Sequence, residues 1–363
     1  MHPDSIVHNL QALLDKAVDC DPEIHNGVLK IASANFEWAG ATGFANSKFK
    51  IPMQTDDQFQ IASITKMITA SLLMKLAEKG LIDLDFGIGH YLPSTITDGL
   101  HVINGKDHGS EITTRQLLSH TSGLADFFGE GETAEPGVLP FVAEMNAHPD
   151  KMWNPLKILD WTKSNLKAHF VPGQGWYYSD TGFLLAGLII EYLTEQKLHT
   201  AMRAYLFDPL YMNHTYTLFR ESKRPSIGDR FPSQVYTGSS IYGATHSVTA
   251  DWACGGLVST TNDLTRFIRA FSNNSIFQSE TTHEQMLSMS STGETGVSYG
   301  LGVRCFNLDE LQMPQMGELV GHTGFIKSFM LYWPKGNTTI CGTLNQSTAK
   351  GVFSKLRPVS SLV

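Results

Sequence analysis

The order of strand-like and helix-like segments constrains the fold of this chain more than any other feature. Residues 27–46 alternate between apolar and polar side chains on either side of Ala34 and Asn35, which predicts a β-hairpin. Further strand patterns lie late in the chain, at residues 298–306, 318–325, 327–333 and 337–346. We therefore expect one antiparallel sheet that is built from both ends of the chain.

The stretch between these strands has the pattern of helices. A short strand is expected at residues 57–63, and residues 81–249 contain helical pieces joined by loops rich in Gly, Pro, Asn and His. We expect an α/β (α+β) sandwich in which helices flank the antiparallel sheet. Residues 1–80 and 250–363 would form this domain, closed by a final helix near residues 349–361. Residues 81–249 would form an inserted, mainly helical lobe, with the active site between the two parts.

The charge of the chain argues against nucleic acid or an anionic membrane as its main partner. The formal net charge is −8, and Lys and Arg form no block. The longest apolar run, residues 182–190, is too short to span a bilayer. The N-terminus lacks the basic and apolar regions of an export signal. The chain as printed predicts a cytoplasmic location, or a periplasmic or secreted one if a signal has been removed.

The four cysteines indicate no metal site. They form no Cys-x-x-Cys pair and no Cys/His cluster with the spacing of zinc ligands: Cys20, Cys254, Cys305 and Cys341. We interpret them as buried thiols and expect neither a metal nor a cofactor. The expected partner is a small-molecule or short-peptide substrate, and the sequence predicts no oligomeric state.

Ser63 and Lys66 are the first candidates for chemistry. The pattern Ser-x-x-Lys occurs three more times, in a polar loop, in a lysine-rich helical stretch and at a strand-to-helix junction: Ser47/Lys50, Ser164/Lys167 and Ser347/Lys350. Only Ser63 begins an apolar helix, which is expected to end near Gly80. Context therefore favours the pair Ser63 and Lys66.

The start of a buried helix suits a nucleophilic serine. Backbone N–H groups there are unpaired and the helix dipole is positive, so negative charge on Ser63 Oγ is favoured. Lys66 lies three residues further on the same helix face. Burial would lower the pKa of Lys66 and let it act as a base on the hydroxyl. The alternative interpretation is an N-cap serine beside a solvated lysine.

Ser298 is a rival nucleophile. It lies in a Gly-x-Ser-x-Gly sequence at residues 296–300. A nucleophile elbow requires a strand, a sharp turn and then a helix. Residues 301–306 alternate like a strand instead, so we reject Ser298.

Three further motifs follow Ser63 in order. They are LLSHTSGL at residues 117–124, VPGQGWYYSDTGFLLAGLIIE at 171–191 and GHTGF at 321–325. Together with ASITK at residues 62–66, they resemble the serine penicillin-recognising hydrolases related to class C β-lactamases. That group includes DD-peptidases, D-aminopeptidases and family VIII esterases. The resemblance extends over about residues 25 to 346 and implies a β-lactamase/transpeptidase-like fold.

The resemblance also implies roles for single residues. Ser63 matches the nucleophile of the family and Lys66 its partner. Tyr178 matches a general base whose phenolate is stabilised by the nearby cation. His322 matches the first residue of the third motif, and the N–H groups of Ser63 and Phe325 would form the oxyanion hole.

Two neighbours of His322 complete the expected site. Thr323 and Gly324 would bind substrate, and Gly324 would let the substrate backbone approach closely. If His322 is protonated, it would anchor a substrate carboxylate. We interpret His120, in the motif at residues 117–124, as structural.

Asp180 departs from the pattern of the family. The second motif usually ends in Asn, whose amide both donates and accepts, whereas an ionised carboxylate only accepts. We place Asp180 among the substrate-binding residues. Its charge would raise the pKa values of Lys66 and His322 and would favour a cationic or small neutral substrate.

The sequence therefore predicts a serine hydrolase that acts through an acyl-enzyme on an amide or ester. The leading interpretation is a DD-peptidase or a D-amino-acid-type peptidase or amidase, because His322 stands where true β-lactamases have Lys. The alternative is a family VIII-type carboxylesterase or weak β-lactamase. An interpretation of another class is a non-catalytic penicillin-binding module.

Overall fold

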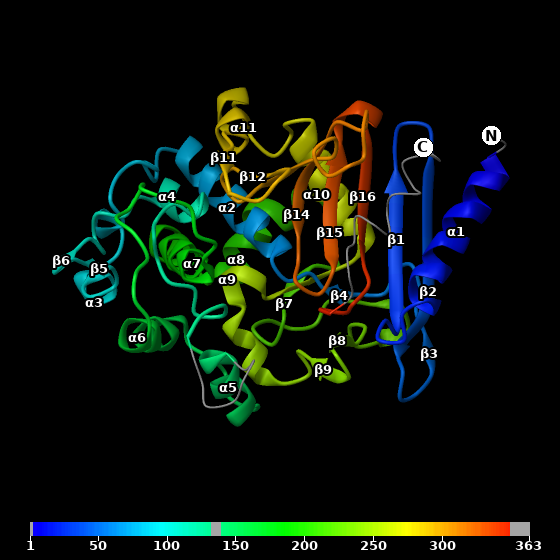
Figure 1. The fold of residues 1–363 in the computed structure, drawn as a ribbon, viewed down its shortest axis with the longest axis horizontal. Coiled ribbons are helices and arrows are strands. Elements are labelled where there is room, and N and C mark those ends of the chain that lie inside the picture. Colours follow the sequence, from blue (N-terminus) through cyan, green and yellow to red (C-terminus); the bar gives the residue numbers. More distant parts are fainter. Residues whose placement is uncertain (1–2, 132–138, 349–363) are drawn as a thin grey trace.

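Both ends of the chain contribute to one antiparallel sheet (Figure 1). The computed structural model describes residues 3–131 and 139–348. Strand β16 pairs with β1, which joins the C-terminal strands to the N-terminal hairpin, as predicted. The order across the sheet is β11 (Ser290–Ser291), β12 (Val297–Tyr299), β13 (Arg304–Asn307), β14 (Glu318–Thr323), β15 (Ser328–Trp333), β16 (Thr338–Thr343), β1 (Asn26–Ala32), β2 (Glu37–Asn46) and β3 (Ile51–Pro52).

Helices cover both faces of this sheet. Helix α1 (Pro3–Asp19) packs on β1 and β2, and α10 (Thr261–Ser272) packs on β1, β15 and β16. Alternate residues of β1 enter different apolar clusters, with Leu29 beside α1 and Val28 in the larger cluster that contains α10. Because side chains alternate along a strand, a strand that is buried along its whole length must be covered on both faces.

Helix α2 (Ile64–Glu78) lies at the centre of the molecule. It contacts β14 and β15 on the sheet side and α7 (Asp180–Thr194) and α9 (Trp252–Gly255) on the other side. We predicted an apolar stripe on α2, but polar positions such as Thr65 and Thr69 are also fully buried. Thr69 Oγ1 donates to the carbonyl of Ala253 at 2.8 Å, which satisfies the buried hydroxyl.

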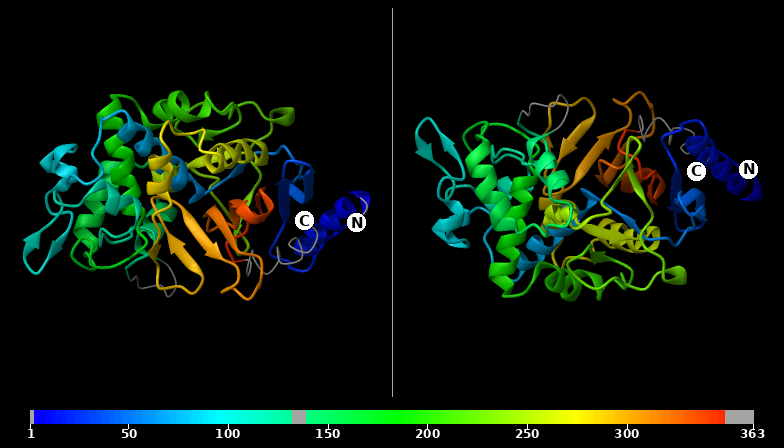
Figure 2. Two further views of the ribbon diagram at one scale, coloured as in Figure 1. Left: turned by 90° about the horizontal axis from the view of Figure 1, so that it is seen from above. Right: turned by 90° about the horizontal axis from the view of Figure 1, so that it is seen from below.

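Several of the remaining helices lie around α7, at the end of the molecule away from the two termini (Figure 2). The helices are α3 (Ser94–Thr97), α4 (Thr114–Leu118), α5 (Pro140–Ala147), α6 (Pro155–Asn165), α8 (Leu198–Met202) and, beside β12, α11 (Glu280–Met286). Short helical turns are η1 (Ile88–His90), η2 (Arg203–Phe207), η3 (Ile227–Asp229), η4 (His246–Ala250) and η5 (Pro334–Gly336).

Among the described residues, three small sheets lie outside the main one. The short strand expected at residues 57–63 is β4 (Phe59–Gln60). It pairs with β10 in a small sheet, whereas the preceding strand β3 belongs to the main sheet. The strands are β4, β10 (Leu257–Ser259) and β7 (Tyr216–Thr217), then β5 (Val102–Ile103) with β6 (Lys106–Asp107), and β8 (Val235–Thr237) with β9 (Ser240–Tyr242).

Several expectations can be compared with this fold. The mixed architecture with a large antiparallel sheet is confirmed. The division at residues 80 and 249 stays a prediction, and the helix expected at 349–361 lies outside the described residues. Three cysteines are buried, but Cys20 is exposed because it follows the end of α1. In the part of the chain that the structure describes, every helix is too short or too polar to cross a membrane.

Candidate active site

Ser63 lies at the N-terminus of α2, directly after a strained residue. Ala62 has a φ of 48°, which is unusual for a residue with a side chain. Ser63 occupies the N-cap position, but its side chain makes no capping hydrogen bond. Its Oγ instead accepts a hydrogen bond from Lys66 Nζ at 3.1 Å. Ser63 is therefore at the N-cap position, as the alternative interpretation expected, but that interpretation is wrong about a solvated lysine, because Lys66 is fully buried.

Lys66 is fully buried, and all three of its N–H bonds have acceptors. Nζ donates to Ser63 Oγ, to the carbonyl of Cys254 at 2.9 Å and to the carboxylate of Asp180, with which it forms an ion pair. Burial lowers the pKa of Lys66, but the charge of Asp180 and the neighbouring Tyr178 outweigh burial and raise the pKa well above its usual value. The prediction that burial makes Lys66 a free base is therefore wrong.

Tyr178 lies beside the same ammonium group. Lys66 Nζ is 4.9 Å from the centre of the Tyr178 ring, and the Arg304 guanidinium carbon is 5.3 Å from it. Burial raises the pKa of Tyr178, and Asp180 raises it further, against the opposing charges of Lys66 and Arg304. The resemblance implied a phenolate, whereas this environment favours the neutral phenol.

Asp180 is the first residue of α7, and its carboxylate faces Lys66. Its backbone N–H donates to Asp126 Oδ1 at 3.2 Å, so the carboxyl group of Asp126 is a close neighbour of Asp180. Burial and the charge of Asp180 raise the pKa of Asp126 well above its usual range. The expected increase in the pKa of Lys66 is thus confirmed, and Asp180 contacts the lysine rather than open solvent.

His322, on β14, is fully buried and both of its ring nitrogens have partners. Nε2 lies 2.9 Å from the hydroxyl of Tyr299, and Nδ1 lies 2.8 Å from the carbonyl of Thr323. Burial lowers the pKa of His322 well below its usual value, and Arg304 and Lys66 lower it further. We predicted that Asp180 would raise the pKa of His322 and that protonated His322 would bind a substrate carboxylate. Both predictions are wrong, because the pKa of His322 is lowered and both ring nitrogens are occupied.

The turn after β14 lies against the start of α2. A methyl group at Gly324 would meet Ser328 Oγ and would lie 2.9 Å from Ala62 Cβ. Because Gly324 has no side chain, the turn can approach Ala62. The close approach that we predicted at Gly324 is therefore to another part of this chain, and not to the backbone of a substrate. Ser328 Oγ donates to the carbonyl of Ile61 at 2.8 Å and ties the two segments together.

This contact brings the two expected oxyanion donors into one region. Phe325 follows Gly324 in the turn, and Ser63 follows Ala62. Among residues 3–131 and 139–348, the backbone N–H groups of Ser63 and Phe325 have no hydrogen-bond partner. Unpaired N–H groups beside a serine hydroxyl are the donors that an oxyanion hole requires.

Asp251 is a buried carboxyl group that the sequence analysis missed. It accepts hydrogen bonds from the hydroxyl of Tyr242 at 3.1 and 3.3 Å. Burial raises the pKa of Asp251 to about 7, and the charge of Asp180 contributes to this increase. Trp252, the next residue, has a φ of 26°, a strained value for a bulky side chain. No motif marks Asp251, because its neighbours come from other parts of the chain.

Replacing Asp251 with Asn should change how stability depends on pH. The ordinary pKa of an unfolded Asp is about 4, so between about pH 4 and pH 7 the folded wild type binds more protons than the unfolded chain. Its free energy of unfolding should therefore fall, relative to Asp251→Asn, by up to about 1.4 kcal/mol per pH unit in this window and stay level above it. Urea unfolding of both proteins at a series of pH values measures this difference.

The subtraction removes the contribution of other groups, because Asp126 and Asp180 are present in both proteins. Asn also keeps an oxygen that can accept from Tyr242. A difference in unfolding free energy that stays constant from pH 4 to about pH 8 would contradict the raised pKa of Asp251.

Other serines that the sequence offered do not share this setting. Ser298 lies in β12 and pairs with Cys305 of β13, so no elbow forms there, as predicted. Ser164 lies within α6 and donates to the carbonyl of Asp160. For Ser347, the lysine of the Ser-x-x-Lys pattern is Lys350, which lies outside the described residues.

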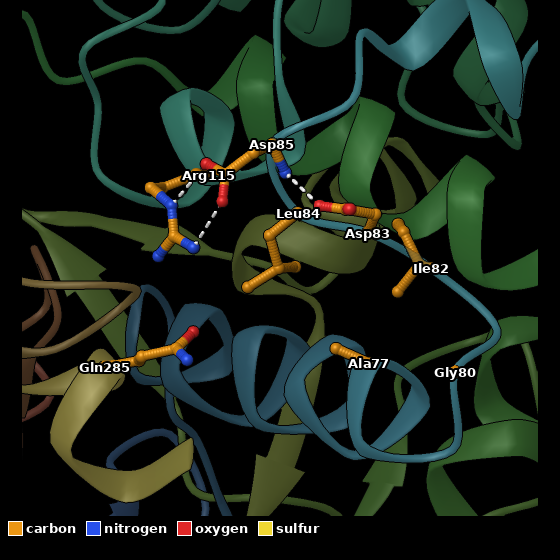
Figure 3. Close-up of a pocket in the computed structure, with 8 residues that line it drawn as sticks. All are labelled: Ala77, Gly80, Ile82, Asp83, Leu84, Asp85, Arg115 and Gln285. Carbon is orange, nitrogen blue, oxygen red and sulfur yellow. Dashed lines mark hydrogen bonds and ion pairs between the residues drawn. The ribbon is translucent and has the colours of Figure 1, made fainter. Parts of the chain in front are cut away.

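A cavity of about 440 Å³ lies at the other end of α2, beside Ala77 and Gly80 (Figure 3). Arg115 forms two hydrogen bonds with Asp85 at its edge, at 2.6 and 2.8 Å. Because α2 rises about 1.5 Å per residue over 15 residues, this cavity is about 20 Å from Ser63. It is separate from the candidate active site.

A serine and a buried lysine at the start of a central helix, next to a large antiparallel sheet, define a class of fold. The structure of a D-stereospecific amidohydrolase from Streptomyces sp. has the same fold, with a TM-score of 0.74 and 26% identity over 93% of this chain and 94% of that one. The sequence model of the beta-lactamase family matches residues 9–359. The chain belongs to the beta-lactamase family, a family of serine hydrolases.

Two curated relatives differ in their names. A penicillin-binding protein of Bacillus subtilis is 28% identical over 315 residues, which are 83% of this chain and 63% of that protein. The esterase EstB of Burkholderia gladioli is 27% identical over 228 residues, which are 61% of this chain and 54% of that protein. The chain thus matches less than two thirds of the length of either relative.

Proposed function

We propose that this chain hydrolyses amides or esters through an acyl-enzyme on Ser63. The observation that carries the proposal is the hydrogen bond from the buried Lys66 Nζ to Ser63 Oγ at the N-terminus of α2. Ser63 Oγ would attack the carbonyl carbon of the substrate. The N–H groups of Ser63 and Phe325 would stabilise the negative charge on the carbonyl oxygen, and water would later release the acyl group.

The proton of Ser63 requires an acceptor, and Lys66 as an ammonium group cannot be one. Lys66 would first transfer a proton to Asp180, its ion-pair partner, and would then accept the proton from Ser63 Oγ. This sequence conserves charge, because Lys66 and the protonated Asp180 together carry one positive charge when the tetrahedral intermediate carries one negative charge. Tyr178, a neutral phenol because its pKa is raised, would donate a proton to the leaving group.

The surroundings of Lys66 favour substrates without a carboxylate. Asp180, Asp126 and Asp251 are all buried near this lysine. His322 already uses both ring nitrogens and offers no charged anchor. Within the predicted classes, we therefore favour a D-amino-acid-type amidase or peptidase over a carboxypeptidase, whose substrate ends in a carboxylate. The name of the amidohydrolase from Streptomyces sp. agrees with this choice.

The second candidate is a carboxylesterase, which the likeness to the esterase EstB supports. A panel of D-amino-acid amides, D-Ala-D-Ala peptides, p-nitrophenyl esters and nitrocefin separates these activities. Labelling with a fluorescent penicillin adds a second test. Stable labelling is expected of a peptidase, transient labelling of a β-lactamase, and the absence of labelling together with hydrolysis of esters or amides identifies an esterase or amidase. A chain without any turnover would be a non-catalytic module.

Short p-nitrophenyl esters should be hydrolysed with a higher kcat/KM than nitrocefin, by about tenfold or more. Nitrocefin carries a carboxylate, which the carboxylate of Asp180 beside Lys66 would repel, and a repulsion of about 1.4 kcal/mol corresponds to a factor of ten in kcat/KM. Steady-state kinetics with both substrates measures the ratio. Equal kcat/KM values, or the same ratio in Asp180→Asn, would contradict this explanation.

A further inference from the structure

His120 holds the backbone on both sides of Tyr178. The carbonyl of His120 accepts a hydrogen bond from the N–H of Tyr177 at 2.9 Å. The side chain of His120 accepts another, at Nδ1, from the N–H of Ser179 at 3.1 Å. The backbone of His120 has a φ of 60°, a left-handed conformation that is uncommon for His. This conformation lets its carbonyl and its side chain reach the same segment.

The hydrogen bond to Ser179 fixes the protonation of the imidazole. Nδ1 accepts, so the proton of the neutral ring lies on Nε2. His120 is only 1% exposed, and burial lowers the pKa of His120 well below its usual value, with further decreases from Lys66 and Arg304. The ring is therefore neutral at ordinary pH and adds no charge beside Lys66.

The ring of His120 also contacts the ring of Tyr178. The two ring centres are 4.2 Å apart with an angle of 35° between their planes. Tyr299 lies 4.6 Å from His120 on another side. The Tyr178 ring thus contacts both the imidazole of His120 and the ammonium group of Lys66, which is 4.9 Å from its centre. Rotation of the Tyr178 side chain would break both contacts.

A purely structural histidine does not explain one feature of this arrangement. Nε2 of His120 is buried and has no hydrogen-bond partner among the described residues. An unpaired buried donor costs about 1 to 3 kcal/mol, which Phe at this position would avoid. Only a side chain that combines a flat ring with an acceptor at the position of Nδ1 can both stack on Tyr178 and bind the N–H of Ser179.

We propose that His120 is a positioning residue for the reaction, which holds the Tyr178 side chain in place beside Lys66. The proposal rests on the function proposed above and extends the structural role that the sequence suggested. His120 does not touch the reacting atoms. It acts through the backbone at Tyr177 and Ser179 and through the ring of Tyr178.

The test compares three variants in the hydrolysis of p-nitrophenyl acetate. His120→Phe keeps the ring and loses the acceptor, and we expect kcat to fall on the order of 100-fold with KM within about threefold, the size of effect produced by a misplaced catalytic group. His120→Asn places an oxygen where Nδ1 was, whereas His120→Gln places it about where Nε2 was. We expect kcat for His120→Asn to exceed that for His120→Gln by about tenfold or more.

His283→Phe is the matched control. Nε2 of His283, on α11, is also buried without a partner, and its ring packs against Phe271 at 4.7 Å. The same substitution there should leave kcat and KM unchanged. Urea unfolding of each variant shows whether a loss of activity follows a loss of folded protein.

Two results would overturn the role of His120. One is a folded His120→Phe variant with the kcat of the wild type, and the other is equal kcat values for His120→Asn and His120→Gln. The Asn and Gln pair still decides the question if His120→Phe does not fold. Labelling of the wild type by a fluorophosphonate at Ser63 separates this proposal from the proposed function, because the role of His120 can fail while Ser63 is still labelled.

Discussion

Replacing Ser63 with Ala should abolish hydrolysis of esters and amides, with a loss of at least about a thousandfold in kcat. The variant should also lose covalent labelling by a fluorophosphonate, because the attacking oxygen is gone. The fold should persist, since the Ser63 side chain makes no capping hydrogen bond and its removal should cost only about 1 kcal/mol. Steady-state kinetics, mass spectrometry of the labelled peptide and urea unfolding measure the three quantities.

Ser298→Ala is the matched control for this experiment. Ser298 lies in a Gly-x-Ser-x-Gly sequence, but its strand position gives it no lysine partner of the kind that Ser63 has. Its replacement should change neither turnover nor labelling. A label that maps to Ser298 in the wild type, or a Ser63→Ala variant that still turns over substrate, would remove the basis of the proposed mechanism.

Replacing Lys66 with Met should cost both activity and stability. Hydrolysis should fall by at least about a thousandfold, because Ser63 Oγ loses its only side-chain partner among the described residues. The carboxylate of Asp180 would remain without its cation in a site where its side chain is only 13% exposed. Breaking a buried ion pair from one side typically costs about 3 to 5 kcal/mol. Kinetics and urea unfolding measure the two losses.

The double variant Lys66→Met with Asp180→Asn separates these losses. It removes both charges, so most of the stability should return, while activity should stay low because Lys66 is still absent. If the double variant is no more stable than Lys66→Met, the ion pair is not the cause of the destabilisation.

Asp180→Asn alone tests whether Asp180 accepts the proton of Lys66. In the wild type the ion pair can pass this proton internally, whereas in the variant Lys66 must lose its proton to solvent before it can act as a base. Activity of the variant should therefore begin at higher pH than that of the wild type, which the acid limb of kcat/KM measures. An acid limb at an unchanged or lower pH would show that Asp180 is not the proton acceptor.

The sequence by itself determined the architecture and the position of the candidate nucleophile. The alternation of residues 27–46 specifies a hairpin, because side chains of a strand alternate between two faces. Ser63 and Lys66 meet because residues three apart share a face of a helix. Both arguments depend only on neighbours in the sequence, which is why they could be made before the structure was known.

Only the tertiary structure decided the charges within the site. The pKa of Lys66 depends on burial and on the charges of Asp180 and Tyr178, which lie far along the chain from it. Burial and the charges of Arg304 and Lys66 lower the pKa of His322, and Asp251, whose pKa is also shifted, belongs to no sequence motif. Burial and long-range charge set a pKa, and neither quantity is defined until segments distant in the sequence have packed together.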